Sequence, residues 1–112
     1  MNFQVRVTRA AKEDLRSIFD WIRDRSPAGA ETWFRRWEQT LVAIEARADH
    51  YGLAPESDGH SEEIRQAIFK TRRGRPYRVL FFIHGIQVVV LYIRGPNQNT
   101  LRLDEIRRPD FT

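Results

Sequence analysis

Residues 77–94 read YRVLFFIHGIQVVVLYIR, and this stretch decides the fold. It contains two apolar runs, Tyr77–Ile83 and Ile86–Ile93, which are separated by His84-Gly85. Two residues that end in glycine between two such runs indicate a tight β-hairpin. Because both runs are apolar at consecutive positions, they would be apolar on both faces of a sheet. We therefore expect two central antiparallel strands that are covered on both sides.

The segments before this hairpin predict two further strands. Phe3, Val5 and Val7 alternate with polar residues, which is the period of a half-buried strand. Ile64–Thr71 is the other candidate strand, and the glycine and proline in residues 72–76 indicate a turn between it and the hairpin.

The connecting segments are less regular. Residues 49–61 contain two glycines, a proline and several polar side chains, and they are interpreted as a loop. Gly95-Pro96-Asn97 would end the sheet after the hairpin. The apolar residues that follow fit either a strand or a short helix, and they are Leu101, Leu103 and Ile106.

Two helices are predicted between the first strand and the loop. Thr8 can cap the first, whose apolar stripe is Ala11, Leu15, Ile18 and Ile22. Ser26-Pro27 starts the second, because serine is a good N-cap and the first helical N–H has no partner for proline to remove. The apolar residues of the second helix alternate steps of four and three, at Ala30, Phe34, Trp37, Leu41, Ile44 and Ala48. The short break predicts an antiparallel helical hairpin.

The order of these elements is β-α-α-β-β-β. We expect an α+β fold in two layers, in which the N-terminal strand joins a mostly antiparallel sheet and the helical hairpin packs on one face of that sheet. A chain of 112 residues can bury enough surface for a core without disulfides. We therefore predict a single domain over residues 1–112.

The composition limits the possible sites and compartments. The chain has no cysteine, which excludes disulfides and thiolate metal sites and is compatible with the reducing cytoplasm. No signal-peptide core or membrane span is visible. His50, His60 and His84 lack the spacing of metal ligands, and His84 is interpreted as a turn residue that tolerates a left-handed backbone. We expect a cytoplasmic protein that has no cofactor, no metal and no membrane partner.

Charge is distributed unevenly along the chain. Residues 1–60 hold nine Lys+Arg and ten Asp+Glu, whereas residues 61–112 hold ten and five. Between Ile64 and Leu103 there is no acidic residue, but eight basic ones: Arg65, Lys70, Arg72, Arg73, Arg75, Arg78, Arg94 and Arg102. A solvated basic face is one interpretation. The other, which we favour, is a positive field that suits a polyanion or an acidic protein surface.

Arg78 is the basic residue whose position most needs an explanation. It begins an apolar strand, on the same side as Leu80 and Phe82. It could pair with Glu62 or Glu63, or it could face a ligand phosphate with its planar, permanently charged fork. The sequence leaves these alternatives open. No phosphate loop or nucleophile motif accompanies it.

Several strings together resemble the RelE/ParE toxin family of type II toxin–antitoxin systems. They occur at the starts of both helices, in Val7-Thr8-x-x-Ala11 and Ser26-Pro27-x-x-Ala30, at Ile64-Arg65, in residues 74–81 (GRPYRVLF), and in Val88–Leu91. The resemblance covers Phe3 to about Leu101 and implies a toxin that a labile antitoxin neutralises by wrapping over its helices and sheet. RelE-like members cleave mRNA on the ribosome, and ParE-like members inhibit DNA gyrase.

Three features favour the ParE-like branch. The string after the last strand, residues 94–98 (RGPNQ), lacks the second basic residue of RelE-like toxins. The tail, residues 107–112, supplies no histidine or tyrosine to act as a base on the RNA 2′-hydroxyl. The paired helices are long, as in ParE-like toxins. The resemblance thus implies a gyrase inhibitor, with a ribosome-dependent mRNA endoribonuclease or a non-toxic interaction module as alternatives.

These interpretations assign roles to particular residues. Arg78 is the candidate catalytic residue if the protein is an enzyme, which we expect less than binding. The target, gyrase or alternatively the ribosome and mRNA, would be bound by Arg65, Lys70, Arg72, Arg73, Arg75, Arg78 and Arg94. The antitoxin would be bound by aromatic residues, because these commonly anchor protein partners, and the candidates are Trp21, Trp33, Tyr77 and Phe82.

Overall fold

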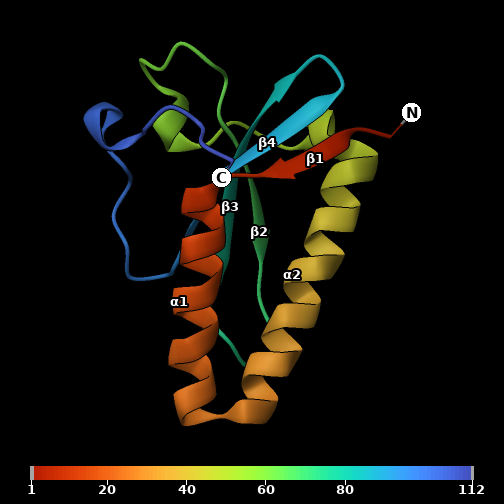
Figure 1. Ribbon diagram of the computed structural model, residues 1–112, viewed down its shortest axis with the longest axis vertical. Helices are drawn as coiled ribbons and strands as arrows, with labels where there is room; N and C mark the ends of the chain where they lie inside the picture. The colour runs from red at the N-terminus through yellow and green to blue at the C-terminus, as the bar shows by residue number, and fades with distance from the viewer. Residues whose placement is uncertain (1, 112) are drawn as a thin grey trace.

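The computed structural model describes residues 2–111 (Figure 1). Its strands are β1 (Gln4–Val7), β2 (Arg65–Phe69), β3 (Tyr77–His84) and β4 (Gln87–Arg94). Its α-helices are α1 (Arg9–Arg25) and α2 (Pro27–Arg47), and its short 3₁₀ helices are η1 (Ala48–His50), η2 (Pro55–Ser57) and η3 (Leu103–Glu105). This order confirms the predicted α+β fold and its β-α-α-β-β-β sequence of elements.

The four strands form one sheet in the order β1-β4-β3-β2. β1 runs parallel to β4, whereas β3 is antiparallel to both β4 and β2. The sheet is therefore mostly antiparallel, as expected, and the N-terminal strand lies beside the last one. The apolar strands β3 and β4 are central, which explains why their sequences are apolar on both faces.

The hairpin turn differs from the prediction by one residue. His84 pairs with Gln87 and belongs to β3, so the two turn residues are Gly85 and Ile86. Gly85 has a φ of +62°, and among the described residues no non-glycine has a positive φ. Glycine at the first central position is what a type II′ turn requires. The interpretation of His84 as a left-handed turn residue was therefore wrong.

The helices begin at the predicted caps. Thr8 Oγ1 accepts a hydrogen bond from the N–H of Ala11 at 3.1 Å, and Ser26 Oγ accepts one from the N–H of Gly29 at 3.0 Å. Pro27 is the first residue of α2. The two helices form a hairpin on one face of the sheet (Figure 1). Neither helix is long and apolar enough to cross a lipid bilayer.

The main core lies between the helices and the sheet. Trp33 and Trp37 of α2 are each 3% exposed, and the rings of Trp33 and Phe69 are 5.6 Å apart between centroids. The two central strands contribute a buried cluster of Val79, Phe81, Val88, Val90 and Ile93. Burial of each side chain of this size contributes about 1.5–3 kcal/mol, so this layer supplies most of the apolar stabilisation.

The opposite face of the sheet is covered by irregular chain, and we call it the far face. Leu80, Val89 and Leu91 are buried there against Ala54 and Ile64 from the segment before β2. The C-terminal segment, residues 101–111, completes this second core with Leu101, Ile106 and Phe111. In this segment η3 is a 3₁₀ helix, which settles the alternative that the sequence left open.

The N-terminal part of α1 is hydrogen-bonded to the part of β4 that extends beyond β1. β1 is shorter than β4, so the last residues of β4 have no strand beside them on this side. Thr8 Oγ1 donates to the carbonyl oxygen of Leu91 at 3.1 Å, and the carboxylate of Asp14 accepts from the N–H of Ile93 at 3.0 Å. Burial raises the pKa of Asp14, and the hydrogen bond from Ile93 and the charge of Arg94 partly oppose this shift.

Candidate functional site

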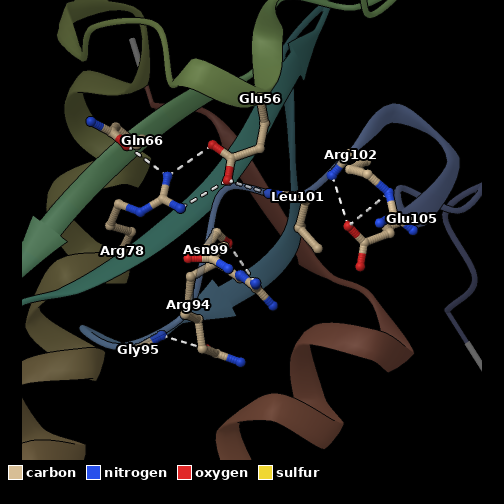
Figure 2. A network of polar contacts seen from close by, with 10 residues as sticks. Glu56, Gln66, Arg78, Arg94, Gly95, Asn99, Leu101, Arg102 and Glu105 are labelled. Carbon is tan, nitrogen blue, oxygen red and sulfur yellow. Dashed lines mark hydrogen bonds and ion pairs between the residues drawn. The ribbon is translucent and has the colours of Figure 1, made fainter.

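Arg78 lies in a polar network on the far face (Figure 2). Its guanidinium donates two hydrogen bonds to the carboxylate of Glu56, from Nη1 to Oε1 and from Nη2 to Oε2, both at 2.8 Å. Nη1 also donates to Oε1 of Gln66 at 3.0 Å, and Oε2 of Glu56 accepts from the N–H of Leu101 at 3.2 Å. The side chain of Glu56 is 0% exposed and that of Arg78 is 19% exposed. The pair joins β3 to the loop before β2 and to the C-terminal segment.

The pKa values of both partners reflect this pairing. Burial raises the pKa of Glu56, but hydrogen bonds from Arg78 and from backbone N–H groups outweigh it, and the pKa lies below its ordinary value of 4.5. The hydrogen bond to Glu56 raises the pKa of Arg78. The carboxylate partner is thus neither Glu62 nor Glu63, the two candidates from the sequence. A guanidinium that is held by a buried carboxylate is poorly placed to bind a phosphate, and removal of either partner would destabilise the fold.

Arg65 and Arg94 are held by backbone carbonyl groups. Arg65 Nη1 donates to the carbonyl oxygen of Tyr51, and its Nη2 lies 3.9 Å from the carboxylate of Glu63. Arg94 Nη2 donates to the carbonyl oxygen of Asn99 at 2.6 Å (Figure 2). The Nε atom of Arg94 is buried and lacks a hydrogen-bond partner among the described residues. Both arginines are half-buried, so they present only part of their charge to solvent.

Of the seven predicted target-binding residues, the four cations between β2 and β3 are exposed. We call residues 70–76 the basic turn, and its exposed cations are Lys70, Arg72, Arg73 and Arg75. Of the carboxylates in residues 2–111, none forms an ion pair with these four side chains. The predicted target-binding residues therefore divide into strand arginines with partners on the far face and a solvent-exposed basic turn.

The four aromatic residues predicted to bind the antitoxin lie in different environments. Trp21 is 56% exposed, and the guanidinium of Arg25 lies 3.8 Å from the centroid of its ring. Tyr77 and Phe82 are half-buried and pack on opposite faces of the sheet. Trp33 belongs to the main core and is 3% exposed, so its side chain is not available at the surface to a protein partner.

A hollow on the far face joins residues that sequence reasoning did not connect. Its volume is about 280 Å³, and its lining includes His60, Glu62, Phe82, Arg107 and Arg108. Nδ1 of His60 accepts a hydrogen bond from the N–H of Glu62 at 3.0 Å, so neutral His60 carries its proton on Nε2. This histidine can donate a hydrogen bond, but its basic nitrogen is occupied. No sequence signal could have found the hollow, because its lining comes from distant segments without a shared motif.

Metal ligation is not supported by the described part of the chain. Residues 2–111 contain no group of three His, Asp or Glu side chains that could hold a metal ion. The basic turn presents guanidinium and ammonium groups, which can recognise anions through charge-assisted hydrogen bonds.

The comparison with known families identifies the chain. Residues 5–99 match the family described as the ParE toxin of type II toxin–antitoxin system, parDE. This chain belongs to the ParE toxin family. Membership confirms the resemblance seen in the sequence, and it implies an antitoxin as the partner. Compared with curated proteins, the chain shows no match.

The part of this ParE-family toxin that matches the family does not include its whole fold. The match covers the sheet apart from Gln4, both helices, the basic turn and Arg78, and it ends at residue 99. Leu101, Ile106 and Phe111 lie beyond it and complete the second core. The C-terminal segment is therefore a structural part of this ParE-family toxin that the family match does not describe.

Proposed function

We propose that this ParE-family toxin is a binding inhibitor of DNA gyrase that acts in the cytoplasm and is neutralised by a cognate antitoxin. The observation that carries this proposal is that the guanidinium of Arg78 is already hydrogen-bonded to a carboxylate. The candidate catalytic arginine is engaged by the buried carboxylate of Glu56, whereas the exposed members of the predicted target-binding set lie on the basic turn. This arrangement favours binding over catalysis.

The proposed target-binding surface is centred on the basic turn. Lys70, Arg72, Arg73 and Arg75 would contribute most, because they are exposed and without carboxylate partners in residues 2–111. Arg65 and Arg94 would contribute less, since carbonyl groups already use part of their donors. Arg78 would contribute indirectly, because its hydrogen bond to Glu56 helps to hold the fold on which this surface rests.

The proposed antitoxin surface includes Trp21, with Tyr77 and Phe82 as secondary contacts. Trp21 is the most exposed of these aromatic side chains, and exposed tryptophans often anchor protein partners. Trp21→Ala should therefore weaken antitoxin binding by about tenfold or more, as measured by titration calorimetry. An unchanged affinity would exclude Trp21 as an anchor.

A gyrase supercoiling assay tests the proposed function. We expect the purified toxin to block supercoiling, the antitoxin to restore it, and mRNA in a translating extract to remain uncut. Blocked growth without any effect on supercoiling would contradict the proposal. If expression left growth unaffected, the protein would instead be a non-toxic interaction module.

The hollow on the far face is the observation that favours the ribonuclease alternative. Arg107 and Arg108 could stabilise a pentavalent phosphate, and His60 could donate a proton from Nε2. RNA cleavage also needs a base for the 2′-hydroxyl, and the basic nitrogen of His60 is occupied. Cut mRNA that disappears in the His60→Gln variant would establish this alternative and overturn the gyrase proposal.

A further inference from the structure

The backbone of the basic turn holds two of its arginines in an exposed position. The N–H of Gly74 donates to the carbonyl oxygen of Thr71 at 3.1 Å, which places Arg72 and Arg73 at the two central positions of a β-turn. A Cβ atom on Gly74 would overlap with Oγ1 of Thr71, so glycine leaves room for this hydroxyl inside the turn. Arg72 and Arg73 are therefore at the tip, exposed to solvent.

Both ends of the basic turn are anchored to the rest of the fold. Nε of Arg36, on α2, donates to the carbonyl oxygen of Lys70 at 3.1 Å. Nη1 of Arg75 donates to Oδ1 of Asn97 at 3.0 Å. Each contact uses one N–H of a guanidinium that has five, so Arg36 and Arg75 add positive charge beside the tip as well as rigidity.

The positive charge of the basic turn has no direct carboxylate partner within residues 2–111. In the described part of the chain, Arg36 and the four cations of the basic turn form no ion pair. Five neighbouring cations without a counter-charge create a positive potential that attracts a polyanion. An unbroken row of phosphates fits this display, because each guanidinium can bind one phosphate oxygen pair.

The side chains of the basic turn fit a nucleic-acid backbone better than a protein surface. A protein interface normally has an apolar core with aromatic residues, but residues 70–76 contribute only Pro76 as an apolar side chain. The nearest exposed apolar residue along the chain is Ile68, which lies on β2 outside the turn. The turn thus offers charge without an apolar centre.

A double-stranded nucleic acid fits better than a single strand. Proteins that bind single strands stack the bases on exposed aromatic rings. The aromatic residue next to the turn, Tyr77, is half-buried, with its ring centroid 5.4 Å from that of Trp33 and 6.0 Å from that of Phe69. Because this ring is already packed, the turn can only contact a backbone.

We propose that the basic turn binds the phosphate backbone of duplex DNA, without reading its sequence. This inference extends the proposed function, because it names duplex DNA as a ligand of the target-binding surface. Its biological meaning rests on the proposed inhibition of gyrase. The binding itself can be measured without gyrase, so its failure is distinct from a failure to inhibit supercoiling.

Fluorescence anisotropy with a short labelled DNA duplex tests the proposal. For the wild type we expect binding at about 50 mM salt that weakens steeply towards about 200 mM. Arg72→Gln combined with Arg73→Gln should bind at least about tenfold more weakly. It should also reduce the slope of log affinity against log salt by about 2, because each phosphate contact contributes about 0.9. Circular dichroism should show an unchanged fold, since both side chains are exposed.

The matched control is Lys12→Gln combined with Arg16→Gln. These two residues are exposed on α1 and form no ion pair within residues 2–111, so the control removes the same charge elsewhere. It should keep nearly the wild-type salt slope. An equal loss in this control, or no loss in the turn variant, would overturn the proposal, and so would wild-type protein that fails to bind duplex DNA.

Two further arms test the choice of ligand. Tighter binding to the single strand than to the duplex would overturn the assignment to duplex DNA. Binding to an acidic polypeptide in place of DNA, lost in Ile68→Ala, would show that the turn serves a protein partner instead.

Discussion

At the scale of single residues, Arg78 and Glu56 form a buried ion pair in which each charge needs the other. The carboxylate is 0% exposed, and both of its oxygens accept from the guanidinium at 2.8 Å. Glu56→Gln would leave a largely buried cation without its counter-charge, which destabilises a fold by about 3–5 kcal/mol. Urea unfolding should show this loss. Glu62→Gln is the control and should change stability by less than about 0.5 kcal/mol, because Glu62 has no ion pair among the described residues.

The same pair predicts how stability depends on pH. The pKa of Glu56 is lowered in the folded state, so its stabilising contribution is fully present above the ordinary pKa of 4.5 and is lost as the pH falls through the lower, folded value. Asp14 acts in the opposite direction, because its pKa is raised. The difference in unfolding free energy between wild type and Glu56→Gln removes this background. It should shrink on acidification, and a difference that stays constant with pH would contradict the assignment.

The partner of Arg78 could not be predicted from the sequence, and the reason is physical. An arginine on an apolar strand face indicates that a counter-charge or ligand must exist. Which carboxylate fulfils this need depends on how the loop before β2 folds back over the sheet, and that loop has no hydrophobic period to reveal its path. Adjacent Glu62 and Glu63 were close in sequence, but Glu56 is close in space.

At the scale of secondary structure elements, local sequence signals were sufficient to predict where the helices begin. The caps at Thr8 and Ser26 and the proline at position 27 act through hydrogen bonds or dihedral angles of neighbouring residues, so the sequence predicted both helix starts correctly. The strand ends were predicted less closely, since they depend on which neighbour pairs with them. The predicted strand Ile64–Thr71 is longer than the observed β2, and the observed hairpin turn lies one residue later than predicted.

The hairpin between β3 and β4 gives a testable prediction at this scale. Gly85 has a φ of +62°, and a Cβ atom there would meet nothing within 4 Å, so Gly85→Ala introduces backbone strain without a clash. We expect a loss of about 1–2 kcal/mol in thermal unfolding. Gly52→Ala also places its Cβ in open space, but without a positive φ, so it should be neutral or slightly stabilising. Equal effects of the two substitutions would exclude strain at the turn.

At the scale of the whole molecule, the acid-free stretch did not become a single arginine surface. The sequence shows where basic residues are concentrated along the chain, but it could not say which cations find partners. Arg78 meets a carboxylate from outside the stretch, and Arg65 and Arg94 meet carbonyl groups. Arg102 is exposed but pairs with Asp104 and Glu105. The cations of the basic turn are exposed and have no carboxylate partner within residues 2–111. The candidate site therefore follows from the fold as much as from the charge pattern.

The C-terminal segment connects the fold and the site, and its removal should affect both. Leu101 is 9% exposed, its N–H binds Glu56, and Phe111 lies 4.0 Å below the guanidinium of Arg6. A chain that ends at Thr100 should lose at least about 2 kcal/mol of stability, because burial of Leu101 alone contributes about that much. It should also bind a hydrophobic dye, since Leu80 and Leu91 become exposed.

Phe111→Ala is the milder companion to this truncation. It removes the cation–π contact with Arg6 and the partly buried packing of one ring on the second core, and it should cost about 1–2 kcal/mol without dye binding. A truncated protein with wild-type stability and no dye binding would mean that the segment does not cover the far face in solution. The hollow and the Glu56 network would then be open to solvent, because the N–H of Leu101 and the cover over Glu56 both come from this segment. Arg78 would keep Glu56 and Gln66 as partners, but the pair would be solvated, and Glu56→Gln would cost far less than about 3–5 kcal/mol.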